Sequence, residues 1–157
     1  MAEWDIEDLE GWEEKIRVKV EEFGLSCFDQ EFEVCDHNQM LGYMAYSGMP
    51  SHYPHWSYGK SFEKLKTMYD YGVSGLPYEM VINSDPSLAY LMTDNSLCLQ
   101  VLTIAHVYGH NDFFKNNFTF QTTNPEHALS RFKIHADRVR SYLEDPSIGV
   151  DKVEAIL

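Results

Sequence analysis

Cysteine is scarce in this chain, and the few cysteines form no recognisable pattern. The 157 residues contain three of them, Cys27, Cys35 and Cys98, with no Cys-x-x-Cys pair. An odd, scattered set of thiols argues against a disulfide framework and is typical of a protein in a reducing compartment. The sequence therefore predicts a cytoplasmic location.

Basic residues are also few. Lysine and arginine number 12 against 25 acidic residues, which gives a formal net charge of −13. This balance argues against nucleic acid as a partner, which needs a basic stripe, and against docking on anionic lipid. The opening MAEWD is acidic where a signal peptide needs a basic region. The longest apolar run, residues 97–117, is too rich in Gln, His, Asn and Lys for a membrane span.

The pattern of apolar residues predicts one folded domain of the α+β class. A hydrophobic content of 44% and a length of 157 residues suffice for one sizeable core. Helical periodicity covers residues 5–23, 37–47, 61–71, 97–117 and 125–143, and strand patterns cover 31–34, 77–83 and 88–92. A turn joins the last two strands, which predicts a hairpin. We expect a mostly helical fold, about half helix, with a small antiparallel sheet beside a central buried helix.

The central helix is the run at residues 97–117, which carries two histidines. It is apolar on nearly all sides, so we expect burial on nearly all sides, with Thr93 or Asp94 as its N-cap. His106 and His110 lie four residues apart and therefore share a face. Metalloproteases of the HExxH type bind zinc with this spacing and use the Glu as general base. Here Val107 occupies the position of that Glu.

Two interpretations of the histidine pair remain open at this point. His106 and His110 can bind zinc or another divalent transition metal, with a carboxylate and a water completing the site. They can equally be structural histidines whose rings are hydrogen-bonded to polar neighbours. Glu79 is the first candidate for the missing general base, because it interrupts an otherwise apolar strand. A carboxylate there either faces water at a sheet edge or points into a site.

The segment at residues 48–60, GMPSHYPHWSYGK, is irregular and aromatic. Its prolines and glycines break any helix. One interpretation is a loop that lines a site, and the other is an aromatic loop packed over the core with its polar groups paired. We predict that His55 and Trp56 lie against the histidine helix.

Four motifs in order resemble the SpoVR-like family (stage V sporulation protein R). They are GMP at 48–50, HWS with GK at 55–60, YE with VINS at 78–84, and His106-xxx-His110 running into FFKNN at 113–117. Family members are much longer, so the resemblance implies that this chain is an N-terminal fragment whose partner is its own missing C-terminal part. A later family segment resembling Asn-Glu-Gly-Trp-Ala implies a zincin-like arrangement, with a third metal ligand beyond residue 157.

The resemblance implies a link to spore cortex formation and gives a process more readily than a reaction. The motifs imply a set of residues lining the site: His55, Trp56, Lys60, Tyr78, Asn83, Asn111, Asp112, Lys115 and Asn116. Three functions follow as hypotheses: a metal-dependent hydrolase-like domain, a non-catalytic regulatory or assembly protein with a basic protein partner, or a fragment without activity of its own. The metal site is expected to be empty, weakly occupied, or completed by a ligand outside the family pattern in this chain.

Overall fold

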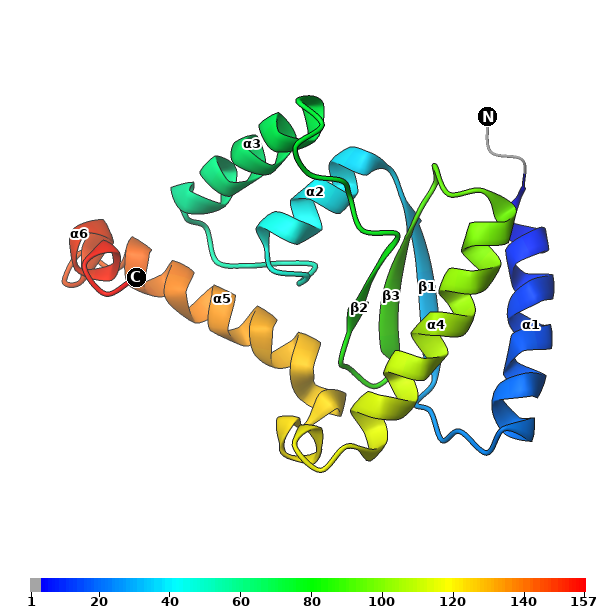
Figure 1. The fold of residues 1–157 in the computed structure, drawn as a ribbon. Coiled ribbons are helices and arrows are strands. Elements are labelled where there is room, and N and C mark those ends of the chain that lie inside the picture. The colour runs from blue at the N-terminus through cyan, green and yellow to red at the C-terminus, as the bar shows by residue number, and fades with distance from the viewer. Residues whose placement is uncertain (1–3) are drawn as a thin grey trace.

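The computed structural model describes residues 4–157 and shows an α+β fold in which helices dominate (Figure 1). The first three residues of the acidic start lie outside the described part. The α-helices are α1 (Ile6–Glu22), α2 (His37–Ala45), α3 (Trp56–Asp70), α4 (Leu97–Asn116), α5 (Ala128–Glu144) and α6 (Gly149–Glu154). The strands are β1 (Gln30–Cys35), β2 (Glu79–Ile82) and β3 (Ser87–Met92), and two 3-10 helices span Phe120–Thr123 and Pro125–His127. About half of the described residues are helical, as the periodicity predicts.

The three strands form one mixed sheet, in the order β1-β3-β2. β2 pairs antiparallel with β3, which confirms the hairpin, but β1 pairs with β3 in parallel. The expectation of a purely antiparallel sheet is therefore wrong. Parallel neighbours need a long crossover, and α2, α3 and β2 supply it here. Local patterns identify a hairpin, but they do not reveal a pairing between strands so far apart in sequence.

Helices cover both faces of the sheet, and each face has its own core. Alternation along β3 directs successive side chains to opposite faces. Leu91 packs with Leu9 of α1 and Ile104 of α4, and all three are buried. Tyr90 points the other way and packs in a second core with Met40 of α2. Figure 1 shows the resulting arrangement, with α1 and α4 on one side of the strands and α2 and α3 on the other.

The histidine helix α4 begins at Leu97, as expected, but its N-cap differs from the expected one and the helix is less buried than expected. Ser96 is its N-cap and accepts a hydrogen bond from the backbone of Leu99, so Thr93 and Asp94 do not serve as caps. One side of α4 packs on α1 and another on β2 and β3. The remaining side faces outward, where Leu102 and Phe113 are 63% and 52% exposed. The expectation that α4 is buried on nearly all sides is therefore wrong, because the side that carries Leu102 and Phe113 is exposed.

The C-terminal helices extend away from the sheet. α5 runs outward from the end of α4, and α6 packs against its far end (Figure 1). α6 also contacts the start of α3, where His55 and Trp56 bond to Glu154. Within residues 4–157, no helix has both the length and the hydropathy that a membrane crossing requires.

Candidate metal centre

The two histidines of α4 meet on one face of the helix, as their spacing predicts. Their Nε2 atoms lie 2.9 Å apart, and their rings are nearly perpendicular, with centroids 4.4 Å apart. The side chain of His106 is 62% exposed, whereas His110 is partly covered and stacks on Phe114. The pair is thus open to solvent and to a ligand.

Glu79 joins this pair from the sheet. It is the first residue of β2, and its side chain lies on the α4 face, while the next residue, Met80, points into the opposite core. Its Oε1 lies 3.6 Å from Nε2 of His106, and only 18% of the side chain is exposed. Of the two alternatives left open by the sequence, the structure has the carboxylate pointing towards the histidines rather than into solvent.

The three donor atoms fit a metal ion. One ligand atom each from Glu79, His106 and His110 lies within 4.8 Å of the other two. Ligands of a tetrahedral zinc ion at about 2.1 Å are about 3.4 Å apart, and the separations of 2.9 Å between the two Nε2 atoms and 3.6 Å between His106 and Glu79 are close to that value. Imidazole nitrogen and carboxylate oxygen are also donors that zinc and iron accept. The same 2.9 Å separation is equally the length of an ordinary hydrogen bond between the two rings.

A small cavity adjoins the donor atoms. Its volume is about 320 Å³, and Tyr78, Glu79, Leu102, Thr103 and His106 line it. Leu102 and Tyr78 are exposed at its mouth, whereas Thr103 is buried. Tyr78 therefore lies beside the candidate centre, where the sequence motifs place it.

Four other residues expected to line the site lie on a different side of α4. Asn111, Asp112, Lys115 and Asn116 all bond to the loop that joins α1 to β1. The wholly buried Asn111 accepts from the N–H of Phe28 at 2.7 Å and donates to its carbonyl at 3.0 Å. We call these four residues the loop clamp. The expectation that they line the histidine site is wrong, because their polar atoms are engaged by this loop.

The loop clamp works mainly through the backbone of the loop. Asp112 accepts from the N–H of Ser26 at 2.7 Å, and Lys115 donates to the carbonyl of Cys27 at 2.6 Å. Asn116 donates to the carbonyl of Ser26 at 2.9 Å. Burial, as the largest cause, raises the pKa of the Cys27 thiol beside them. The NDxxKN part of the sequence motif therefore holds the chain in place.

His55, Trp56 and Lys60 also lie away from the histidine helix. His55 is the N-cap of α3, and both His55 and the indole N–H of Trp56 bond to Glu154 of α6. Trp56 is 62% exposed, and the Lys60 ammonium lies 5.6 Å from its ring. The prediction that they contact α4 is wrong, because α6 supplies their partner. The hydrogen bond from Trp56 and then the charge of His55 hold the pKa of Glu154 below its usual value.

Asn83 follows the far end of β2 from Glu79. Its Nδ2 donates to Thr123 at 3.0 Å, and its buried Oδ1 has no partner among the described residues. It lines a separate hollow beside Met49 and Met80. The structure therefore does not bring Asn83 to the histidines.

Sequence reasoning missed three neighbours of the candidate centre. Leu102 and Thr103 line its cavity, and Phe114 stacks on His110 at 6.0 Å between centroids. All three lie three or four residues from a histidine on the same helix. The helical spacing that identifies the histidine pair could also have found them.

Comparison with known proteins identifies the family. The family model described as "SpoVR like protein" matches residues 3–157. This chain belongs to the SpoVR-like family. It is 37% identical over 156 residues to the protein named "Uncharacterized protein YcgB" from Escherichia coli (strain K12), covering 99% of this chain and 30% of that relative. No solved structure matches the chain significantly, so the expected zincin-like arrangement has no known structure to support it.

Proposed function

We propose that this SpoVR-like chain binds one divalent transition metal ion through His106, His110 and Glu79. The supporting observation is the convergence of three donor atoms, from two elements far apart in sequence, within 4.8 Å of one another. Three protein ligands leave a fourth position open, which is typical of catalytic rather than structural zinc sites. Glu79 thus has the role of a third ligand within the chain itself.

A metal bound here would polarise a substrate oxygen or lower the pKa of a bound water. The chain's own contribution is to hold two neutral imidazoles and one carboxylate in position on two packed elements. Val107 is buried and is not ionisable, so it offers no general base next to His106. When Glu79 is a ligand, it is not available as the general base.

We propose hydrolase-like activity only for a longer protein. The chain spans about 30% of the length of its E. coli relative, which leaves room for a further ligand from outside residues 1–157. With that ligand in place, Glu79 would be free to accept the proton of an attacking water. The resemblance to the sporulation family suggests spore cortex formation as the process, and the free cysteines suit the cytoplasm.

A second candidate is a non-catalytic regulatory or assembly protein. The observation that favours it is the 2.9 Å separation of the two Nε2 atoms, which one ring can bridge by donating to the other. In that case the histidines stabilise the structure, and the exposed face of α4 is a contact surface. The net charge of −13 favours a basic protein as partner.

Metal titration of the purified chain separates the two candidates. Chain stripped with chelator is titrated with Zn²⁺ against a chromogenic competitor, and bound zinc is measured by elemental analysis. We expect one zinc per chain, lost in His106→Ala and His110→Ala, and weakened about 10–100-fold in Glu79→Gln. His135→Ala on α5, an exposed histidine outside the site, is the matched control and should retain full binding.

The same titration can overturn the proposal. Equal zinc content in the wild type, His106→Ala and His110→Ala would show that the pair is structural. Binding that survives Glu79→Gln unchanged would remove Glu79 from the ligand set. Cobalt in place of zinc adds a geometric measurement, because a tetrahedral site gives strong visible absorption.

A further inference from the structure

The outer edge of β1 is open. β1 is an edge strand, and no described strand lies beyond it. Ser87 donates to the carbonyl of Asp29, and Thr93 donates to that of Cys35, so the odd-numbered residues of β1 bond to β3. In a parallel pair, alternate residues of a strand direct their N–H and C=O groups to opposite edges, so the even-numbered residues of β1 direct theirs away from β3. Phe32 therefore presents an N–H and a C=O to the open edge.

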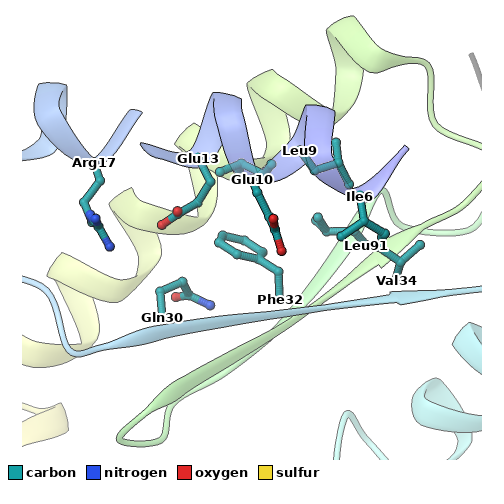
Figure 2. A pocket seen from close by; sticks show the side chains of 10 residues that line it. Ile6, Leu9, Glu10, Glu13, Arg17, Gln30, Phe32, Val34 and Leu91 are labelled. Atoms are coloured by element: carbon teal, nitrogen blue, oxygen red, sulfur yellow. The ribbon is translucent and has the colours of Figure 1, made fainter. Parts of the chain in front are cut away.

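A cleft lies directly above this edge, between β1 and α1. Its volume is about 280 Å³, and Figure 2 shows the Phe32 ring at its centre. Ile6 and Leu9 of α1 and Val34 of β1 form an apolar end, and Val34 also directs backbone groups to the open edge. The carboxylates of Glu10 and Glu13 point into the cleft from α1 (Figure 2). The cleft is therefore apolar at one end and around Phe32, and acidic where Glu10 and Glu13 of α1 line it.

The charge around the edge is one-sided. Glu31 and Glu33 alternate with Phe32 and lie exposed on the opposite face of β1. Together with Glu10 and Glu13, they place four carboxylates around the open edge. Among the described residues that line the cleft, Arg17 is the one basic side chain. A ligand that carries positive charge on one face and apolar groups on the other complements this surface.

We propose that β1 and the cleft above it bind an extended, basic segment of another protein, which adds a strand to the sheet. Main-chain hydrogen bonds to Phe32 and Val34 would provide pairing, as in known cases of strand addition. Alternate apolar side chains would enter the cleft beside Phe32, and alternate lysines or arginines would face Glu31 and Glu33. This site is separate from the proposed metal centre, which lies at the other edge strand.

A second copy of this chain is the less suitable occupant. Pairing β1 with β1 would bring Glu31 and Glu33 of one copy next to those of the other. Like charges directly opposite one another destabilise a strand pair. Charged edge residues are also a common means of preventing such self-pairing. The same charges attract a basic strand.

A short synthetic peptide tests the proposal. The probe is a fluorescein-labelled eight-residue peptide of alternating lysine and valine, measured by anisotropy with the whole chain in chelator. We expect binding that weakens at least tenfold at high salt, because the charges are exposed. A second peptide with the same side chains carries N-methyl groups on both edges. It cannot pair with β1 in either strand direction, so it should bind at least tenfold more weakly.

Amide hydrogen exchange measures the strand pairing directly. Exchange at Phe32 and Val34 should slow on peptide binding, while exchange at residues of α3 should not change. Glu31→Lys should weaken binding about tenfold, whereas Glu63→Lys, an equal charge change on the exposed face of α3, should change it less than twofold.

Three results would overturn the proposal. The first is peptide binding without protection of Phe32 and Val34. The second is equal affinity for the N-methylated peptide, which would show a general charge effect. The third is no binding of the peptide at millimolar concentration. In that case, ultracentrifugation tests a second copy of the chain as the occupant: self-association that Glu31→Lys alters would assign the edge to it.

Discussion

The two polar sides of α4 differ in what their side chains bind. On one side, the loop clamp of Asn111, Asp112, Lys115 and Asn116 bonds mainly to backbone groups of the loop before β1. On the other side, His106 and His110 bond to each other and lie beside Glu79. Both sets come from one helix and one continuous sequence motif.

This difference separates structural residues from candidate ligands. Side chains bonded to backbone are held in place by those bonds, and removing them leaves backbone groups unpaired. Side chains that converge on each other, with one ring largely exposed, keep capacity for a metal ion. Successive helix residues are about 100° apart, so His110 and Asn111 can serve these two roles side by side.

The largest expected effect is the loss of stability on breaking the loop clamp at its buried residue. Asn111 makes three hydrogen bonds, two to the backbone of Phe28 and one to the side chain of Gln30. Asn111→Leu keeps a similar volume and removes all three. We expect the free energy of unfolding to fall by about 2–4 kcal/mol, because buried backbone groups are left unpaired. Urea unfolding followed by circular dichroism measures this change.

A matched asparagine provides the control for this experiment. Asn38 lies exposed in the first turn of α2, and Asn38→Ala should change stability by less than about 0.5 kcal/mol. A loss in Asn111→Leu no larger than in Asn38→Ala would show that the clamp is dispensable. The distinction between the two sides of α4 would then fail.

The next effect concerns zinc, and it should belong to the histidine side alone. If the proposed site binds zinc, a concentration 100-fold above Kd stabilises the folded chain by about 2.7 kcal/mol. We expect the midpoint of thermal unfolding to rise with zinc in the wild type and in His135→Ala. It should not rise in His106→Ala, whose midpoint without zinc should be close to that of the wild type because the ring is exposed.

Asn111→Leu sharpens this measurement. It should unfold at a lower temperature than the wild type and still gain the full increase with zinc. If zinc did not raise the unfolding midpoint of Asn111→Leu, although the variant is folded at the start of the measurement, the two sides of α4 would be coupled. Their separation into structural and ligand residues would then be wrong.

Local periodicity was enough to predict much of this fold. It identified the histidine helix, the β2–β3 hairpin and the shared face of His106 and His110, because each depends on spacing within one segment. The parallel pairing of β1 with β3 depends on a crossover through α2 and α3, which no local pattern encodes. The exposed stripe of α4 was missed because an all-apolar helix gives no sign of which side is left uncovered.

Of the residues predicted for the candidate site, the sequence places some correctly and others wrongly. Glu79 was singled out because a carboxylate within an apolar strand is unusual, and it does lie beside His106. The residues of the loop clamp were grouped with the histidines because they are adjacent in the motif. Adjacency in sequence does not fix the face of a helix, and the partner loop at 26–28 lies far away in the chain. His55 and Trp56 were misplaced for the same reason, since Glu154 is distant in sequence.

The smallest expected effect is pH-dependent and belongs to the clamp side of α4. Tyr108 is buried there, and its hydroxyl donates to Glu13. Burial first, and then the hydrogen bond and charge of Glu13, raise the pKa of Tyr108. A phenol whose pKa is raised by folding contributes stability that is complete below its unfolded value of about 10. That contribution is lost as the pH rises from there towards the folded value.

Tyr108→Phe removes the hydroxyl and with it this pH dependence. We expect the variant to be about 1 kcal/mol less stable than the wild type at neutral pH, since one hydrogen bond is lost. The gap should narrow as the pH rises above about 10, because the wild type then loses stability that the variant never had. Urea unfolding at several pH values between neutral and alkaline measures this difference in the free energy of unfolding. The ionisation of the other tyrosines does not contribute to the difference, because both proteins contain them. Tyr71→Phe, at the exposed end of α3, is the control and should change stability at neutral pH by less than about 0.5 kcal/mol. A gap for Tyr108→Phe that stays constant through this range would mean that the buried hydroxyl does not favour its neutral form, and that this side of α4 is more open than its hydrogen bonds indicate.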